Sequence, residues 1–350
     1  MSSSYQVRKF AIFEYGSHNR QAVSLATTIK SILPEAIITL FYRNDWYKFD
    51  NRSFVVKKTS NQYLMLLTQI FYTCLGYDII VSTSPEACRL HVKLLFKLIA
   101  LIGPYRSERI VCLRDIKQDR GESILRFLTK YTTDSIVVES RSIAHACKAA
   151  GLRVNAVHPP NTHRDRPIPY GPVPPAEETK IVLLGSLDTE RRSYDIPATA
   201  CEALLKKGHK LQIRIGGQCR ISERSKFLWR RLQLMDNTLE SRATLLDHEL
   251  DQVLMDADVI ICCNRGDYYG SMKPSGALGD TILSGRVCLA PIELLSSFKN
   301  DEGLFDFYLN EADLFDKILS VINSKTCNML SASLIESYVF DFEKLLIPKN

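Results

Sequence analysis

The sequence predicts an α/β protein made of two Rossmann-like domains, each a doubly wound parallel sheet with helices on both faces. Short apolar runs of β type alternate with helical segments along both halves of the chain, and this alternation is typical of parallel sheets. A proline-rich stretch at 159–175 separates the two series, and its prolines exclude a central strand there. The length of 350 residues suffices for two domains with substantial cores.

The first domain is expected to span 1–165 and to open with a strand, a loop and a helix. The strand at 9–13 ends near Gly16, and a helical pattern then runs from Gln21 until Pro34 stops it. This single glycine is not the Gly-x-Gly-x-x-Gly fingerprint of dinucleotide sites, so alone it is weak evidence for a ligand. Further strands are expected at 36–42, 53–57, 77–84, 109–116, 135–139 and 154–157, and further helices at 63–75, 85–102, 122–131 and 141–150.

The second domain is expected at 179–330, after an extended linker at 166–178. A C-terminal amphipathic helix is expected within 331–350, its pattern running from 334 to 346. The strands of the second domain are expected at 180–185, 211–215, 243–246, 258–263 and 287–290, and its helices up to 207 and at 222–234, 249–256 and 277–284.

Composition and charge exclude several classes of protein. The chain is 45% hydrophobic and 24% charged, which is normal for a globular protein. Its net charge of +6 is too mild and too dispersed to indicate nucleic-acid binding. The ten cysteines lack zinc-type spacing, and we expect them to be reduced thiols in a cytoplasmic protein. No signal peptide and no membrane-spanning run is recognisable in the sequence.

A basic stripe bears on membrane contact. Arg89, Lys93 and Lys97 recur every four residues, so they share one face of the helix expected at 85–102. The stripe is either the solvated outer face of an ordinary helix or a surface that meets lipid headgroups. We therefore expect a cytoplasmic protein and leave open a weak peripheral contact with a membrane.

The segment at 267–291 carries most of the functional information. It joins two apolar strands through a polar loop with Lys273, after which a helix begins near Ser275 and Gly276. The first amides of a helix have no intrahelical partner and attract anions such as phosphate. Lys273 adds a positive charge, and Asp280, about one turn into the helix, suits the vicinal hydroxyls of a ribose. These features describe a nucleotide-sugar site; the alternative is an ordinary surface turn between a strand and a helix.

This segment resembles the donor-binding signature of GT-B-fold glycosyltransferases, especially glycosyltransferase family 4. That family's pattern is Glu, seven residues, Glu, then Ala-x-x-x-Gly and an apolar strand. The run from Asp280 to Pro291 matches the second half, with Asp for the second Glu, whereas the first Glu falls on Met272. A second match is the strand, glycine and loop ending in Arg191-Arg192, which resembles the family segment whose Arg and Lys bind the donor diphosphate. Ser186 stands in place of the family's Arg, and Arg191, or Arg192 if the loop is one residue longer, falls where the family has its Lys.

The resemblance implies a fold, a reaction and a donor site. In the GT-B fold, the two domains face each other across a cleft and the last helix, here in 331–350, crosses back onto the first domain. The reaction is transfer of a hexosyl or related group from a nucleotide-diphosphate sugar to a glycan, lipid-linked or other hydroxyl acceptor, with retention of configuration. No cofactor and no metal are expected, because Asp256 and Asp258 are interpreted as boundary residues of a helix and a strand. The implied donor-binding residues are Gly16, Arg191, Lys273, Ser275, Gly276, Ala277, Leu278 and Asp280.

The catalytic expectations concern both domains. Lys273 is expected to stabilise the departing diphosphate, because negative charge grows there as the glycosidic bond breaks. An inverting enzyme would instead need a general base in the first domain. Asp115, after a strand, is the first candidate, followed by His18 and Glu14. The family often has His where this chain has Arg114, so the acceptor side departs from its pattern.

Two alternatives stay open. A sugar-nucleotide epimerase of the same architecture would use the same phosphate site without an acceptor. A catalytically silent partner subunit would explain Met272 and Ser186, which stand where the family has a Glu and an Arg.

Overall fold

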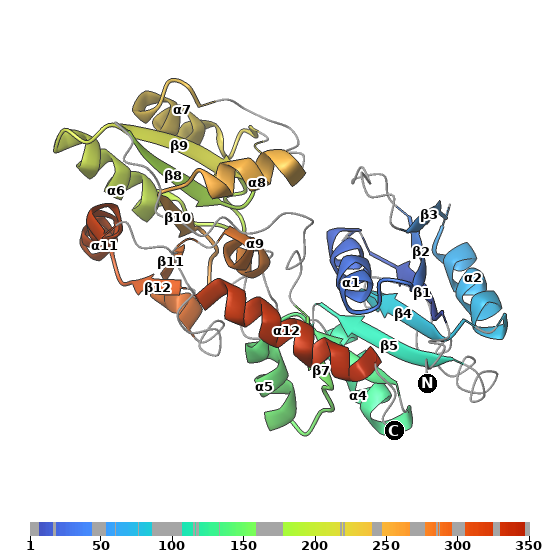
Figure 1. Ribbon diagram of the computed structural model, residues 1–350. Helices are drawn as coiled ribbons and strands as arrows, with labels where there is room; N and C mark the ends of the chain where they lie inside the picture. The colour runs from blue at the N-terminus through green and yellow to red at the C-terminus, as the bar shows by residue number, and fades with distance from the viewer. Residues whose placement is uncertain are drawn as a thin grey trace, which may run out of the picture. The chain divides into compact units, whose positions relative to one another are not determined.

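The chain folds into two compact units. Unit 1 comprises Met1–Asp165, Met272–Pro274 and Ser337–Asn350, and unit 2 comprises Arg166–Ser271 and Ser275–Glu336. The computed structural model (Figure 1) describes residues 7–16, 19–43, 54–59, 61–75, 77–85, 107–114, 116, 119–132, 134–158, 178–217, 219, 221–239, 247–266, 277–284, 286, 288–295, 305–324 and 330–346.

Unit 1 is built on a seven-stranded sheet with strand order β3-β2-β1-β4-β5-β6-β7, and each of these strand pairs is parallel. Its strands are β1 (Lys9–Glu14), β2 (Ile37–Tyr42), β3 (Val55–Lys58), β4 (Ile79–Thr83), β5 (Glu108–Leu113), β6 (Ser135–Val138) and β7 (Ala156–Val157). The described helices are α1 (Asn19–Ile32), α2 (Gln62–Cys74), α4 (Asp119–Tyr131) and α5 (Arg141–Ala149), together with the end of α12 (Leu330–Leu346).

The core of unit 1 follows from strands that are apolar on both faces. Residues 10–13 of β1 are fully buried, as expected for a parallel sheet covered by helices on both sides. Helix α1 packs Leu25 and Ile29 against one face of the sheet, and α12 adds Phe342 and Leu346 to the same cluster. Helix α2 lies on the opposite face from α1 (Figure 1). There, Phe13 and Phe41 stack with ring centroids 4.6 Å apart.

Unit 2 is built on a five-stranded parallel sheet with strand order β12-β11-β10-β8-β9. Its strands are β8 (Thr179–Leu184), β9 (Leu211–Gly216), β10 (Val259–Cys262), β11 (Cys288–Pro291) and β12 (Phe305–Tyr308). Its described helices are α6 (Asp195–Lys206), α7 (Lys226–Met235), α8 (Asp247–Met255), α9 (Ala277–Ser284), η2 (Ile292–Leu294) and α11 (Glu311–Ser324).

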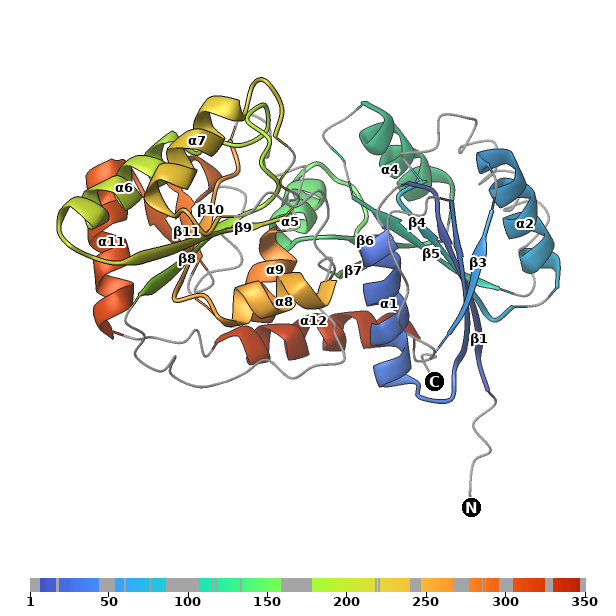
Figure 2. The same cartoon turned by 90° about the horizontal axis from the view of Figure 1, so that it is seen from above.

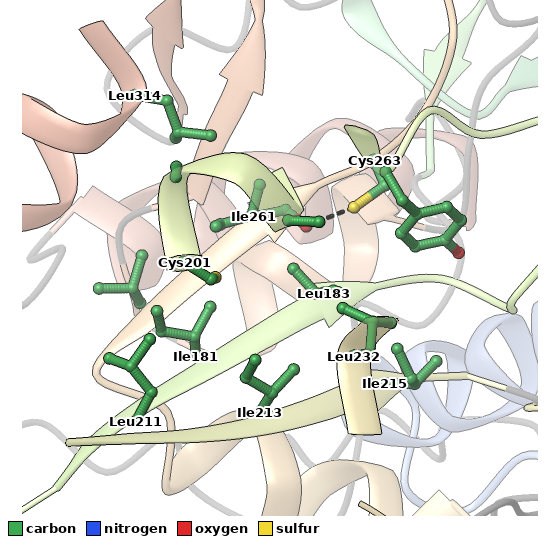
Figure 3. Packing of buried hydrophobic residues seen from close by; sticks show 14 of the residues in the cluster. Ile181, Leu183, Cys201, Leu211, Ile213, Ile215, Leu232, Ile261, Cys263 and Leu314 are labelled. Atoms are coloured by element: carbon green, nitrogen blue, oxygen red, sulfur yellow. Dashed lines mark hydrogen bonds between the residues drawn. The ribbon is translucent and has the colours of Figure 1, made fainter. Parts of the chain in front are cut away.

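One face of the unit 2 sheet carries a continuous apolar cluster. Figure 3 shows Ile181 and Leu183 of β8 beside Ile213 of β9 and Ile261 of β10. Helices α6, α7 and α11 cover this face through side chains that include Cys201, Leu232 and Leu314. Helices α8 and α9 lie on the other face of the sheet (Figure 2).

The predicted fold class is confirmed: both units are doubly wound parallel sheets. Most predicted elements recur within a few residues, although the helix expected from 222 begins at Lys226, after a turn in which Ser222 and Ser225 bond each other. Strand β12 and helix α11 were not predicted. The linker expected at 166–178 and the helix expected at 85–102 lie outside the described residues except for 178 and 85, and so does the whole strand expected at 243–246. Within the described part of the chain, no helix is both long and apolar enough to cross a bilayer.

Replacing Phe342 by alanine should destabilise unit 1. The ring is fully buried, and its edge meets the His158 ring with centroids 5.2 Å apart. Truncation of a buried Phe costs about 3–5 kcal/mol, because it leaves a cavity. Urea unfolding followed by circular dichroism measures the loss. Phe340→Ala, on the exposed side of the same helix, should change the free energy of unfolding by no more than about 0.5 kcal/mol. Equal effects at both positions would contradict the described packing.

Candidate functional site

The carboxyl edge of the unit 2 sheet has a topological switch point between β8 and β10. From β8 the chain continues to β9 on one side, and it then returns to β10 on the other side. In open α/β sheets, ligands bind outside the carboxyl ends of strands at such a point. Three loops leave this edge here, beginning at Gly185 after β8, at Gly217 after β9 and at Cys263 after β10.

Two glycines allow these loops to approach each other closely. Gly185 has a φ of 111°, which other residues rarely adopt, and a Cβ there would collide with the Arg192 guanidinium. A Cβ on Gly217 would lie 2.6 Å from the backbone carbon of Gly185. The absence of side chains at both positions therefore gives room for a buried arginine, since Arg192 is only 9% exposed.

The loop after β8 is bonded to the end of β10. Arg192 and Asn264 form an isolated antiparallel bridge, and the Ser193 N–H donates to the Cys263 carbonyl at 2.8 Å. Tyr194 closes the loop by donating its hydroxyl to the Ser186 carbonyl at 2.6 Å. These bonds fix Arg192 and Asn264 side by side at the switch point.

Arg191 has a different environment from Arg192. Its Nε lies 2.5 Å from Asp188 Oδ2, and its side chain is 38% exposed. The same aspartate also accepts the Arg191 N–H at 3.3 Å. The Arg191 guanidinium therefore has a carboxylate partner at the loop surface, whereas the Arg192 guanidinium packs against Gly185.

Asn264 is a buried amide with unused hydrogen-bonding capacity. Its exposed fraction is 1%, and within the described part of the chain neither its Oδ1 nor its Nδ2 has a hydrogen-bond partner. A buried polar group without a partner costs about 1–3 kcal/mol. Natural proteins retain few such groups, and each one requires an explanation, such as a ligand that supplies the missing bonds.

Helix α9 (Ala277–Ser284) follows the loop after β10 and brings Asp280 into its first turn. The Asp280 side chain is 7% exposed, and the next residue, Thr281, is fully buried. The backbone amides of Ala277 and Leu278 are at the amino end of this helix, where anions are favoured.

The cysteines near this edge do not supply a nucleophile. Burial raises the pKa of the Cys262 thiol to about 11 and that of the Cys263 thiol well above its usual range. Burial raises the pKa of the Cys288 thiol in the same way. All three thiols therefore stay protonated at neutral pH. No cluster of three or more His, Cys, Asp or Glu side chains suited to a metal ion occurs among the residues that the structure describes. Asp258 instead accepts the Lys180 N–H at 2.7 Å, at the start of its strand.

Unit 1 has its own switch point, between β1 and β4, and Glu14 occupies it. This fully buried carboxylate accepts the Thr83 hydroxyl at 2.6 Å and the Gly16 N–H at 2.7 Å. The neighbouring Ser84 has a φ of 50°, an uncommon conformation for a residue other than glycine. Its hydroxyl donates to Gln21 Oε1 at 3.4 Å. Glu14 thus fixes the first residues after β1, up to Gly16.

A second charged pair lies at the ends of β5 and β6. Arg114 Nε is 3.6 Å from Glu139 Oε2, and the Glu139 side chain is fully buried. The carboxyl edge of the unit 1 sheet therefore carries Glu14, Arg114 and Glu139.

The predicted site residues are only partly described. Gly16, Arg191 and Asp280 have described positions, whereas only the backbone of Ala277 and Leu278 does. His18, Asp115, Lys273, Ser275 and Gly276 lie outside the described residues. Asn264 and Glu139 were not among the predicted site residues. A polar residue just after an apolar strand was the available signal in both cases, because that position lies at the carboxyl edge of a parallel sheet.

Comparison with known protein families finds no match, and comparison with curated proteins finds none either. Solved structures do match over nearly the whole chain. AviGT4, a glycosyltransferase involved in avilamycin A biosynthesis, has a TM-score of 0.55 and 11% identity, with 97% of this chain and 98% of AviGT4 covered. The lipopolysaccharide outer core galactosyltransferase WaaB has a TM-score of 0.57 and 13% identity, with 97% and 99% covered. A putative UDP-N-acetylglucosamine 2-epimerase from Listeria monocytogenes has a TM-score of 0.54 and 8% identity, with 93% and 89% covered. At these identities the similarity shows a shared fold.

Replacing Asn264 by leucine should stabilise the ligand-free protein. The substitution removes a buried amide without partners and keeps a similar volume, so the free energy of unfolding of unit 2 should rise by about 1–3 kcal/mol. Chemical denaturation measures the change. Asn310→Leu is the matched control, because Asn310 accepts the Asp313 N–H at the start of α11. Loss of that cap should lower stability by about 1 kcal/mol. A destabilising effect at Asn264 would contradict its lack of partners.

Proposed function

We propose that the chain is a glycosyltransferase that moves a hexosyl or related group from a nucleotide-diphosphate sugar to a hydroxyl acceptor. The observation that carries the proposal is the pair Arg192 and Asn264, a buried cation beside a buried amide at the switch point of unit 2. Such a pair suits a polar, anionic ligand at the position where open α/β sheets bind nucleotides. The similarity to solved glycosyltransferases supports the same class of reaction.

In this proposal the donor diphosphate rests on the amino end of α9. The amides of Ala277 and Leu278 would bind its oxygens, assisted by Ser275, Gly276 and Lys273. Asp280 would accept the ribose hydroxyls, as the resemblance to family 4 implies. Gly16, in unit 1, remains a proposed contact of the same donor.

We assign the main cationic role in the loop after β8 to Arg192 and a secondary role to Arg191. Arg192 is buried beside Asn264, so its charge acts on a bound anion through a medium of low dielectric. Arg191 is more exposed and is paired with Asp188, and both factors weaken its attraction for a phosphate.

Catalysis would come mainly from stabilising the departing diphosphate. Negative charge grows on it as the glycosidic bond breaks, and Arg192 and Lys273 would bind that charge more strongly in the transition state than in the ground state. Retention is the outcome that the family resemblance implies, and no metal requirement is expected because Asp256 and Asp258 are interpreted as boundary residues. An inverting reaction would need a base in unit 1, and Asp115 and His18 are the proposed candidates. Glu14 is a positioning residue in either case, because it holds the turn that precedes His18.

The epimerase is a second candidate, favoured by one solved structure of similar fold. It would isomerise a nucleotide sugar in the absence of any acceptor. Incubation with the donor alone, followed by chromatography of the sugar nucleotide, separates the two reactions. Measured nucleotide binding without turnover across a broad acceptor panel would instead indicate a silent partner subunit.

Removing a positive charge from the donor site should weaken donor binding. Lys273→Ala and Arg192→Ala should each cost about 1.5–3 kcal/mol, the scale of a charge-assisted hydrogen bond, and Arg191→Ala should cost less. A thermal-shift panel of nucleotide sugars first identifies the donor, and calorimetry then measures its affinity. Arg230→Ala, on the exposed side of α7, is the control and should leave affinity unchanged. Unchanged affinity in both Lys273→Ala and Arg192→Ala would place the donor elsewhere.

Transfer activity should persist in a chelator. The proposed diphosphate ligands are amides and cations, which replace the role of a divalent metal. Turnover is compared with and without EDTA, after buffer exchange. Activity that disappears in EDTA and returns with Mn²⁺ would contradict the metal-independent mechanism.

A further inference from the structure

Helix α2 (Gln62–Cys74) presents its large apolar side chains outward. Its buried residues are Met65, Gln69 and Thr73, two of which are polar. Its exposed face, which we call the α2 surface, comprises Tyr63 (58% exposed), Leu64 (45%), Leu67 (63%) and Phe71 (58%), with Leu75 (57%) directly after the helix.

The α2 surface is continuous and uncharged. At 100° per residue, its side chains fill an arc of about 120° centred opposite Gln69. The helix sequence QYLMLLTQIFYTC contains no charged residue. A helix on the surface of a globular protein normally has the reverse pattern, with its apolar stripe inward and charges outward. A contiguous exposed apolar face of this kind indicates contact with a partner or a membrane.

Bonds on the inner side fix this orientation. Gln69 donates to the Ser82 hydroxyl at 2.9 Å and accepts the Tyr15 hydroxyl, and all three side chains are buried. Tyr72 packs edge-on against Phe41, with ring centroids 4.8 Å apart. Turning the helix to bury its leucines would break these contacts, so the outward apolar face belongs to the stable fold.

The size of the α2 surface favours a bilayer over a second protein. A helix of this length extends about 20 Å and offers a strip about 10 Å wide, on the order of 200 Å². A stable protein interface buries roughly 800 Å² on each partner. A bilayer has no such minimum, because a few inserted leucine and aromatic side chains suffice for reversible binding.

Among the described residues, a lysine of the edge strand β3 lies against α2. Lys57 Nζ, on the edge strand β3, lies 3.0 Å from the Tyr72 hydroxyl, which places the cation against the helix. At the amino ends of β4 and β5, the acidic Asp78 accepts the Lys9 N–H and Glu108 pairs with Arg8. Lysines that border inserted apolar side chains bind anionic lipid headgroups.

We propose that the α2 surface docks unit 1 on an anionic lipid bilayer, with Leu67 and Phe71 inserted and Lys57 at the level of the headgroups. The basic stripe expected at Arg89, Lys93 and Lys97 lies outside the described residues and is not part of this proposal. The proposal concerns binding alone and does not depend on the transferase proposal.

Vesicle flotation with the full chain tests the proposal, without nucleotide sugar. The vesicles are phosphatidylcholine alone, or phosphatidylcholine with phosphatidylglycerol. The protein should float with the mixed vesicles, and the double variant Leu67→Ser/Phe71→Ser should lower the partition coefficient at least tenfold. Lys57→Gln should weaken binding about fivefold, and only to the anionic vesicles. The matched control is Phe227→Ser/Leu234→Ser on α7, whose side chains are 81% and 90% exposed, and it should float like the parent protein.

A second measurement keeps the test independent of any folding defect. Leu67→Trp should show a blue shift of its emission, beyond that of the parent protein, when anionic vesicles are added. Failure of the parent protein to float with anionic vesicles would overturn the proposal, as would an equal loss in the α7 control. A dimer in sedimentation that only Leu67→Ser/Phe71→Ser dissociates, without vesicle binding, would show that a second copy covers the surface.

Discussion

In each unit the first strand of the chain lies inside the sheet and not at its edge, and this constraint determines where a ligand can bind. Strands β1 and β8 come first in their units, yet each has neighbours on both sides. Because crossovers between parallel strands are right-handed, connections that leave in opposite directions pass over opposite faces of the sheet. The carboxyl ends of β8 and β10 are therefore left without a helix between them. Arg192 and Asn264 meet at that opening in unit 2, and Glu14 lies at the equivalent opening in unit 1.

The chemistry of the unit 2 edge depends on what its backbone permits. Gly185 and Gly217 lack side chains at the point where the loops after β8 and β9 approach each other, and the Arg192 guanidinium occupies the space next to Gly185. Burying the Asn264 amide without partners lowers the stability of unit 2. The burial of strands that are otherwise apolar on both faces compensates for this loss. The nearby Cys262 and Cys263 thiols stay protonated at neutral pH and cannot act as nucleophiles, because burial raises their pKa values. In the proposed donor site, the Arg192 cation, the Asn264 amide and the start of α9 would together favour an anionic ligand.

Much of the fold could be predicted from the sequence, because apolar runs such as 9–13 and 180–185 alternate with helical patterns and end at glycine or proline. Strand β12 was missed because Phe305–Tyr308 is four residues long and half exposed, with Asp306 in its middle. The position of Asp280 in the first turn of a helix was predictable from local signals. The burial of Arg192, in contrast to its neighbour Arg191, was not predictable, because it depends on the conformation of Gly185 and not on the type of residue. The outward apolar face of α2 was not predicted either. It depends on the hydrogen bond from Gln69 to Ser82, which joins α2 to β4 and cannot be recognised in the periodicity of the helix sequence.

The last turns of α12 have a consequence for synthesis on the ribosome. Residues from Ser337 onward belong to unit 1, whose other elements are almost all translated before unit 2 begins. Phe342 and Leu346 fill the core beneath β1 and β4, so the early part of the chain emerges with a hole in its interior. The core of unit 1 therefore stays incomplete while unit 2 is synthesised. Unit 2, in contrast, is synthesised almost without interruption and can fold as soon as it emerges. Loss of the residues from Ser337 onward would therefore harm the first unit synthesised more than the second.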